Sequence, residues 1–210
     1  MTDIEKRSGQ LGVEFREADG KRTLVGYAVV WDSDTTIADY FVERIAPGAF
    51  TKALRGDILA LYDHDMGRVL GRTRSKTLRL SEDSHGLKVE IDVPDTSDGN
   101  DLWVLVGRGD VSGMSFAFRA TKQEWDESGD MPTRTVIEAE LFEVTATANP
   151  AYPDTTLAAR SLEKAREDAG KTKKLADAAA ARRRVAEREA RQEQRIRGIQ
   201  PSDGRQADAS

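Results

Sequence analysis

Hydrophobic and polar residues alternate in short runs over the first 150 or so residues, and turns containing Gly, Asp or Ser separate these runs. The alternation predicts strands over residues 11–15, 23–31, 41–45, 57–62, 69–72, 77–81, 87–93, 114–125 and 135–146. The first two are expected to form a hairpin. Because strands do not alternate with long helices, the pattern favours a mainly β fold of the α+β class, a compact barrel or sandwich surrounded by short helices.

Two short helices interrupt the strands. Pro47 can occupy the first turn of a helix, where its missing N–H costs nothing, so a helix is predicted over residues 47–54. A second helix is predicted over residues 98–106, with Asp95, Thr96 or Ser97 as its N-cap and a glycine at its end.

The composition changes abruptly near Arg160, where aromatic residues disappear and Ala, Arg, Glu, Lys and Gln take over. Residues 161–197 are strong helix formers, but most of their apolar positions are alanine. We therefore predict a flexible N-terminus (1–10), a folded domain (11–160) and a helical or disordered tail (161–210). The tail is either a solvated extension or a helix that docks on a partner or pairs weakly as a coiled coil.

Charge and cysteine content restrict the functional classes. The formal net charge of −5 combines 14 Lys or Arg against 9 Asp or Glu from residue 160 onward with 18 against 28 before it. An acidic body of net charge −10 argues against a nucleic-acid-binding surface on the domain. The chain has no cysteine, so it has no disulfide and no thiolate metal site. No signal-peptide pattern and no apolar stretch of about 20 residues is present, so we expect neither secretion nor membrane insertion.

The chain contains two histidines, so a catalytic mechanism that requires histidine has two candidate residues. His85 lies in a polar turn and is expected to be solvated. His64 follows an apolar predicted strand directly, so its ring can project from a strand end into a cleft.

Ser115 lies in a strand whose alternation directs Met114, Phe116 and Phe118 to the core and Ser115 to the other face. A serine in a strand is commonly structural. However, a serine hydroxyl flanked by small residues is also accessible to a peptide backbone, and a nearby imidazole would make it a nucleophile.

A third group that orients the imidazole is expected from the segment containing Glu138, Glu140 and Glu143. Glu143 lies between Phe142 and Val144, in the most apolar part of its strand. A buried carboxylate needs a partner, and His64 is a suitable one.

The sequence resembles the HK97-type prohead proteases of tailed phages, which are related in fold to the herpesvirus assemblins. The resemblance spans about residues 11–160 and is carried, in order, by GYAVVW (26–31), ERIAPGAF (43–50), the strand ending in His64 and Asp65, Gly86 with Leu87, GDVSGMSFAF (109–118) and LFEVTATANPA (141–151). Each motif is weak alone, but the set in this order is specific.

The resemblance implies an assemblin-like β-barrel surrounded by helices and a serine protease mechanism. By motif match, the nucleophile falls on Ser115, the general base on His64 and the acidic residue on Glu143, with Glu140 as the alternative. Thr145 stands where many relatives have serine. No cofactor and no metal is expected.

The resemblance also implies a role in capsid maturation, inside the assembling prohead in the host cytoplasm. The expected substrates are the scaffolding protein or the scaffolding segment of the major capsid protein, and the protease itself. A homodimer is expected by analogy with the assemblins. The tail would recruit the enzyme into the prohead or be removed by self-cleavage.

Two other functions are consistent with the sequence. The chain could be a non-catalytic, β-rich structural or binding module of the virion, in which His64 and Ser115 are incidental. A metal-dependent hydrolase using Asp63, His64 and Asp65 is less favoured, because adjacent strand residues point to opposite faces and few other ligands are available.

Overall fold

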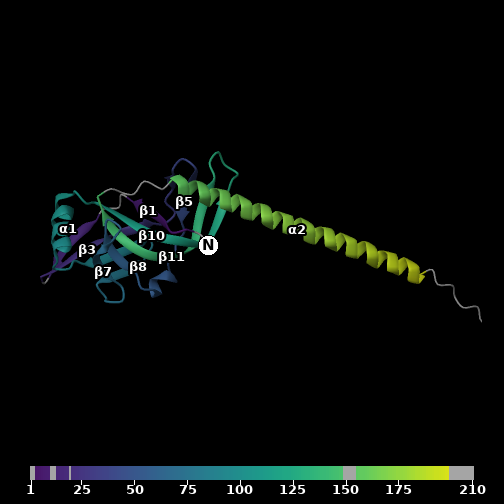
Figure 1. Cartoon of the computed structure of the whole chain (residues 1–210). Helices are drawn as coiled ribbons and strands as arrows, with labels where there is room; N and C mark the ends of the chain where they lie inside the picture. Colours follow the sequence, from purple (N-terminus) through teal and green to yellow (C-terminus); the bar gives the residue numbers. More distant parts are fainter. Residues whose placement is uncertain (1–2, 10–12, 19, 149–154, 199–210) are drawn as a thin grey trace, which may run out of the picture. The chain divides into compact units, whose positions relative to one another are not determined.

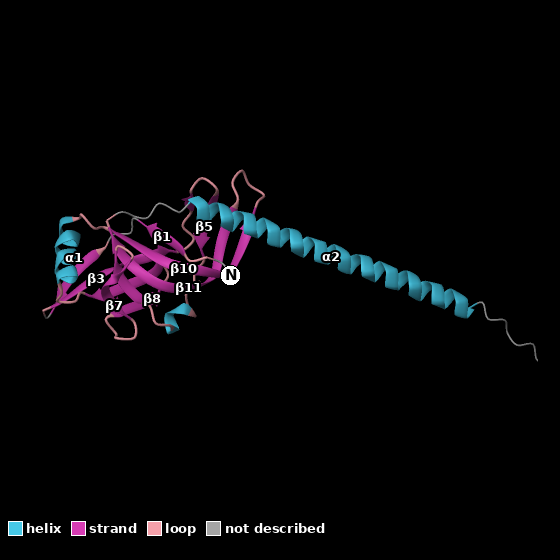
Figure 2. Cartoon of the chain, viewed as in Figure 1, coloured by secondary structure: helices cyan, strands magenta, loops and turns pink. Residues whose placement is uncertain are grey.

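The computed structural model describes residues 3–9, 13–18, 20–148 and 155–198. The chain divides into two compact units, Met1–Glu163 and Lys164–Ser210. Strands dominate the first unit and one long helix continues through the second (Figures 1 and 2). Each unit is described by itself.

The strands form two sheets. The larger sheet has the order β1-β10-β11-β5-β4, and β6 and β7 extend it from β11. Its strands are β1 (Glu5–Gly9), β4 (Thr35–Ile37), β5 (Phe41–Ile45), β6 (Leu59–Tyr62), β7 (Asp65–Arg72), β10 (Gly113–Asp126) and β11 (Thr133–Thr147). The smaller sheet has the order β2-β3-β9-β8 and consists of β2 (Glu14–Ala18), β3 (Lys21–Val30), β9 (Gly86–Asp92) and β8 (Leu78–Glu82).

Side chains from both sheets meet in one core, as the alternation in the sequence predicted. Met114, Phe116 and Phe118 all lie in this core with inward-facing residues of β3 and β9. The Phe50 ring packs edge-to-face against Phe116, with 5.8 Å between ring centroids. Burying a side chain of this size contributes roughly 1.5–3 kcal/mol, so the paired aromatic residues fix the inner face of β10.

The predicted mainly β, α+β class is confirmed, whereas a closed barrel is not observed. Strand pairing in the described part of the chain gives two separate sheets, and no pairing joins the edges of either sheet into a ring. Most predicted strands are present, including the long hairpin of β10 and β11. The strand expected over residues 11–15 lies partly outside the described residues, and β2 begins at Glu14.

The second predicted helix is confirmed and the first is wrong. Helix α1 (Ser97–Arg108) begins after Thr96, whose hydroxyl accepts a hydrogen bond from the Gly99 N–H, and ends at Gly109 with a left-handed φ of +82°. Residues 47–52 instead form successive turns, followed by the short 3-10 helix η1 (Ala53–Arg55). Gly48 adopts a φ of +82°, which interrupts regular helical geometry directly after Pro47.

The N-terminal segment differs from the flexible stretch expected for residues 1–10. Residues 5–9 form β1, which pairs antiparallel with β10 along its whole length. Its Glu5 and Arg7 side chains are buried. β1 is therefore an integral strand of the larger sheet.

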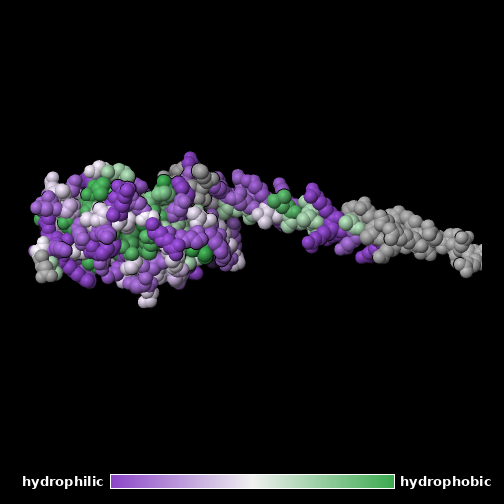
Figure 3. Space-filling model, turned by 90° about the horizontal axis from the view of Figure 1, so that it is seen from below, coloured by the Kyte–Doolittle hydropathy of each residue, from purple (hydrophilic) through white to green (hydrophobic). Residues whose placement is uncertain are grey.

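The tail is helical. Helix α2 (Thr155–Gly198) contributes Leu162 to a small hydrophobic cluster with Ile37 and Phe41. Beyond Glu163 its described side chains are almost all exposed, including Leu175. No helix in the described residues is both long and apolar enough to cross a membrane. Figure 3 shows that hydrophilic residues predominate on the visible face of the molecule, with hydrophobic residues in small separate groups.

Candidate active site

His64 lies in a tight turn between β6 and β7. Tyr62 pairs with Asp65, so Asp63 and His64 form a two-residue connection. Both residues have positive φ values, +54° and +58°, as a type I′ hairpin turn requires. Asn, Asp or Gly is usual at the first position, as Asp63 is, and Gly is usual at the second. A residue other than glycine at the second position, here His64, costs about 1–3 kcal/mol. The site therefore holds His64 in a strained conformation.

Strand β11 holds this turn in place through three hydrogen bonds. The His64 N–H donates to Thr145 Oγ1 (3.0 Å) and the Asp63 N–H donates to the Ala146 carbonyl (3.0 Å). The Thr147 hydroxyl donates to Asp63 Oδ1 (2.8 Å). Because β6 also pairs in parallel with β11, both the strand and the turn that follows it are fixed to the same neighbour.

The His64 ring contacts Glu143 directly. Nδ1 of His64 lies 2.6 Å from Oε1 of Glu143, and the two side chains are 12 % and 7 % exposed. A carboxylate against Nδ1 favours the tautomer with a proton on Nδ1, which leaves Nε2 as an acceptor. Nε2 is buried and has no hydrogen-bond partner among the described residues. The pair thus has the arrangement of an oriented base with its accepting nitrogen free.

Ser115 lies on the same face of the sheet as this pair. In the β10–β11 register Ser115 is opposite Thr145 and Ala117 is opposite Glu143. Cross-strand partners project to the same face, and residues two apart on one strand share that face. Ser115, Thr145 and Glu143 therefore face one side, where Thr145 also binds the turn that carries His64.

The Ser115 hydroxyl does not bond to His64 in this structure. Ser115 is completely buried, and its Oγ donates to the backbone carbonyl of Arg7 in β1 at 2.7 Å. Of the three predicted catalytic residues, His64 and Glu143 are in contact. Ser115 lies in β10, the strand next to that of Glu143, and on the same face of the sheet. Their catalytic roles remain predictions.

Glu140, the alternative acidic residue, is engaged elsewhere. Its carboxylate forms an ion pair with Arg119 at 2.9 Å, and it is opposite Arg119 in the strand register. Glu138 pairs with Lys52. Of the three glutamates, Glu143 is the one whose carboxylate contacts His64.

His85 is in the turn between β8 and β9, as predicted. The His85 ring packs edge-to-face against Tyr27, with centroids 4.6 Å apart, and the backbone N–H of His85 donates to Asp83 Oδ1. Hydrogen bonds from Tyr27 and from the backbone N–H groups of Gly86 and His85 lower the pKa of Asp83. Tyr27, Asp83 and His85 thus organise the turn.

The two carboxylates beside His64 each accept a hydrogen bond from the protein. Asp63 accepts from Thr147, and Asp65 accepts from the Gly67 N–H at 2.8 Å. No group of three or more metal-ligating His, Cys, Asp or Glu side chains gathers in the described part of the chain.

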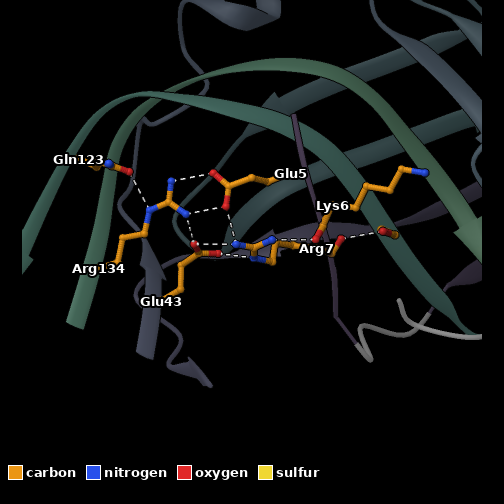
Figure 4. A network of polar contacts seen from close by, with 7 residues as sticks. Glu5, Lys6, Arg7, Glu43, Gln123 and Arg134 are labelled. Atoms are coloured by element: carbon orange, nitrogen blue, oxygen red, sulfur yellow. Dashed lines mark hydrogen bonds and ion pairs between the residues drawn. The ribbon is translucent and has the colours of Figure 1, made fainter. Parts of the chain in front are cut away.

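A buried ionic cluster beside Ser115 was missed in the sequence. Two arginines and two glutamates form it: Glu5, Arg7, Glu43 and Arg134, hereafter the β1 clamp (Figure 4). Arg134 is 1 % exposed and donates to both Glu5 and Glu43, while Gln123 accepts from its Nε at 2.8 Å. Arg7 bridges the same two carboxylates. The signal was weak, because charged residues at alternate positions of a short strand usually indicate an exposed edge.

The clamp shifts the pKa values of Glu5 and Arg134. Burial alone would raise the pKa of Glu5, but the guanidinium groups of Arg134 and Arg7 hold it below its ordinary value. Burial opposes the charge of Arg134 as well, and hydrogen bonds with Glu5 and the charges of Glu43 and Glu5 raise its pKa overall. The pKa shifts of Glu5 and Arg134 therefore both favour the charged forms of these two side chains.

The fold and this site together define the class of the protein: a mainly β domain in which a buried imidazole–carboxylate pair lies on the same sheet face as a buried serine. The family model described as the caudovirus prohead serine protease matches residues 10–168, and the chain belongs to that family. No curated protein matches the chain. Among solved structures, the bacteriophage T4 capsid assembly protease is similar with a TM-score of 0.45 at 12 % identity, covering 69 % of this chain and 96 % of that chain.

Proposed function

We propose that this chain is a serine endopeptidase that matures the capsid of a tailed phage, with Ser115 as nucleophile, His64 as general base and Glu143 as the residue that orients the imidazole. The observation that carries the proposal is the 2.6 Å contact between His64 Nδ1 and Glu143 Oε1, with Nε2 free on the face that holds Ser115. Membership of the prohead serine protease family supports the same reaction.

The proposed reaction is acyl transfer. The Ser115 hydroxyl turns from the Arg7 carbonyl to His64 Nε2, transfers its proton there and attacks a peptide carbonyl carbon. Glu143 stabilises the imidazolium that forms, and backbone N–H groups stabilise the oxyanion. The protonated His64 then donates to the leaving amine, and water hydrolyses the acyl-enzyme. No step requires a cofactor.

The proposed substrates are the scaffolding protein or the scaffolding segment of the major capsid protein, and the protease itself. Cleavage would take place inside the prohead, in the host cytoplasm. The exposed α2 helix is proposed to recruit the enzyme to the shell or to be removed by self-cleavage, and the active form is proposed to be a homodimer.

Co-expression with the major capsid protein of the same phage tests this function. Ser115→Ala should abolish cleavage fragments seen by mass spectrometry, since removing the nucleophile of a triad commonly costs a factor of about 10⁴–10⁶. Ser112→Ala is the matched control, because Ser112 is exposed and three residues away on the same segment. Normal processing by Ser115→Ala would contradict the proposal.

The rival function is a non-catalytic structural module of the virion. Complete burial of Ser115 and its bond to the Arg7 carbonyl are what a structural serine would show. In that case Ser115→Ala and Ser112→Ala would leave the capsid protein pattern equally unchanged.

A further inference from the structure

Strand β1 lies beside Ser115, on the edge of β10 that faces away from β11. β10 pairs with β11 on one side and with β1 on the other, so β1 occupies the remaining edge of β10. The β1 register runs from Glu5 opposite Phe118 to Gly9 opposite Met114, which places Ser115 within the paired segment. An extended peptide that approached Ser115 along this edge of β10 would need the position that β1 holds.

The contact between β1 and Ser115 engages the proposed nucleophile in an unreactive hydrogen bond. The Ser115 hydroxyl donates to the carbonyl oxygen of Arg7, whereas attack on a substrate would join Oγ to a carbonyl carbon. While this bond persists, the hydroxyl proton is directed away from His64, and Nε2 has no partner in the described residues. β1 therefore holds the hydroxyl proton of the proposed nucleophile away from the proposed base.

The β1 clamp secures this strand from the other face. Glu5 and Arg7 are opposite Phe118 and Phe116, so their side chains lie on the core face, away from His64. There they bind Arg134 and Glu43. Two side chains thus anchor β1 without touching the imidazole–carboxylate pair.

The charges of the clamp also permit β1 to leave. β1 contributes one negative and one positive side chain, and Arg134 and Glu43 are also paired with each other at 2.8 Å. These two charges can therefore compensate each other once β1 has left. A buried charge without a partner would be very costly, but departure of β1 leaves none. The same Arg134–Glu43 pair can then accept an acidic and a basic side chain from another extended peptide.

We propose that β1 is an intramolecular inhibitor that occupies the peptide-binding edge of β10, and that this edge takes extended peptides with an acidic residue two positions before the residue whose carbonyl faces Ser115. The inference rests on the proposed function of Ser115. Activity then requires displacement of β1, and a substrate competes with β1 for Arg134 and Glu43.

A disulfide lock tests the inhibition, because the chain contains no other cysteine. Lys6 and Ala117 are directly opposite in the register, so Lys6→Cys with Ala117→Cys can join β1 to β10. Labelling of Ser115 by a fluorophosphonate, followed by intact mass, should be at least tenfold slower in the oxidised than in the reduced protein. The same pair in a Ser115→Ala background identifies the labelled site.

Weakening the clamp should have the opposite effect. Glu5→Gln removes one carboxylate from Arg134 and is expected to accelerate labelling several-fold. Glu14→Gln is the matched control, since Glu14 is an exposed strand residue whose side chain contacts Arg16. Circular dichroism of both variants confirms that the fold persists.

Peptide competition tests the recognition. In the Glu5→Gln protein, excess of the peptide DIEKRSG, which copies residues 3–9, should slow labelling of Ser115. The peptide DIRKESG has the same composition with the two clamp residues exchanged and should not.

The outcomes separate the two proposals. Equal labelling rates in the oxidised and reduced proteins, or in Glu5→Gln and Glu14→Gln, would overturn the inhibition by β1. If Ser115 is still labelled in these experiments, the proposed protease function is not affected. Equal effects of the two peptides would overturn the recognition of charge. Absence of labelling from every variant would contradict the proposed function itself, and the inference with it.

Discussion

At the scale of single residues, the candidate active site combines a strained backbone turn with hydrogen bonds that stabilise it. His64 and Asp63 adopt left-handed conformations that glycine would occupy more easily, and β11 holds them there through Thr145, Ala146 and Thr147. Thr145 has a second neighbour in Ser115, which it faces across the strands. Thr145 thus contacts both the turn that carries the proposed base and the strand that carries the proposed nucleophile.

Glu143→Gln tests the orienting role at this scale. The amide keeps the size of the side chain, but it removes the negative charge that stabilises an imidazolium and can select the wrong tautomer. We expect the rate of Ser115-dependent cleavage to fall by a factor of about 10²–10⁴, with the same midpoint of thermal unfolding to within a few degrees. Single-turnover cleavage of the capsid protein is the measurement.

Glu140→Gln is the control for that variant. Glu140 lies three residues away on β11 and pairs with Arg119 at the surface, so its loss should change the rate by less than twofold. If Glu140→Gln were the more damaging of the two, the acidic role would belong to Glu140.

At the scale of elements, the sequence predicted those features that depend on local patterns of polar and apolar residues. The β10–β11 hairpin, α1, and the inward face of Met114, Phe116 and Phe118 follow from period and capping patterns. The structure selects Thr96 from the three candidate caps. The contact of His64 with Glu143 joins residues 79 apart, and its prediction rested on the cost of burying Glu143 unpaired.

Strand β1 could not be predicted in the same way. The pattern Glu5, Lys6, Arg7 is typical of a solvated terminus, and its burial depends on partners far along the chain, Glu43 and Arg134. The helix expected after Pro47 failed for a related reason. There Gly48 turns the chain, and the Phe50 N–H donates to Glu82, 32 residues away.

The clamp makes β1 sensitive to acid. The pKa of Glu5 is below its ordinary value of 4.5, so its stabilising contribution is fully present above about pH 4.5 and is lost as the pH falls through the lower, folded-state value. Between pH 7 and pH 3 the wild-type protein should therefore lose more free energy of unfolding than the Glu5→Gln variant. Urea titrations at several pH values measure this difference.

Other carboxylates with lowered pKa values, such as Asp57 and Asp92, contribute to acid sensitivity in both proteins and cancel in the comparison. Glu14→Gln should retain the wild-type pH dependence. Parallel pH profiles for wild type and Glu5→Gln would show that Glu5 is not charged in the folded clamp.

At the scale of the whole molecule, the two units have different physical characters. The first unit contains the hydrophobic core and the site, whereas the described side chains of the second are exposed on a single helix. An Ala-rich helix with almost no buried surface gains little from tertiary packing. The stability of the domain and the reactivity of Ser115 should therefore be independent of the second unit.

Truncation after Glu163 tests this independence. The shortened chain keeps Leu162, which packs with Ile37 and Phe41 and is the last of the described side chains of α2 in a buried cluster. We expect an unchanged midpoint of thermal unfolding and an unchanged rate of fluorophosphonate labelling. Leu162→Ala in the shortened chain should instead lower the free energy of unfolding by about 2 kcal/mol, because it removes a buried leucine side chain at the end of the domain. A truncated chain that unfolds like the Leu162→Ala variant would mean that the second unit stabilises the first, and recruitment or removal of the tail would then alter the protease itself.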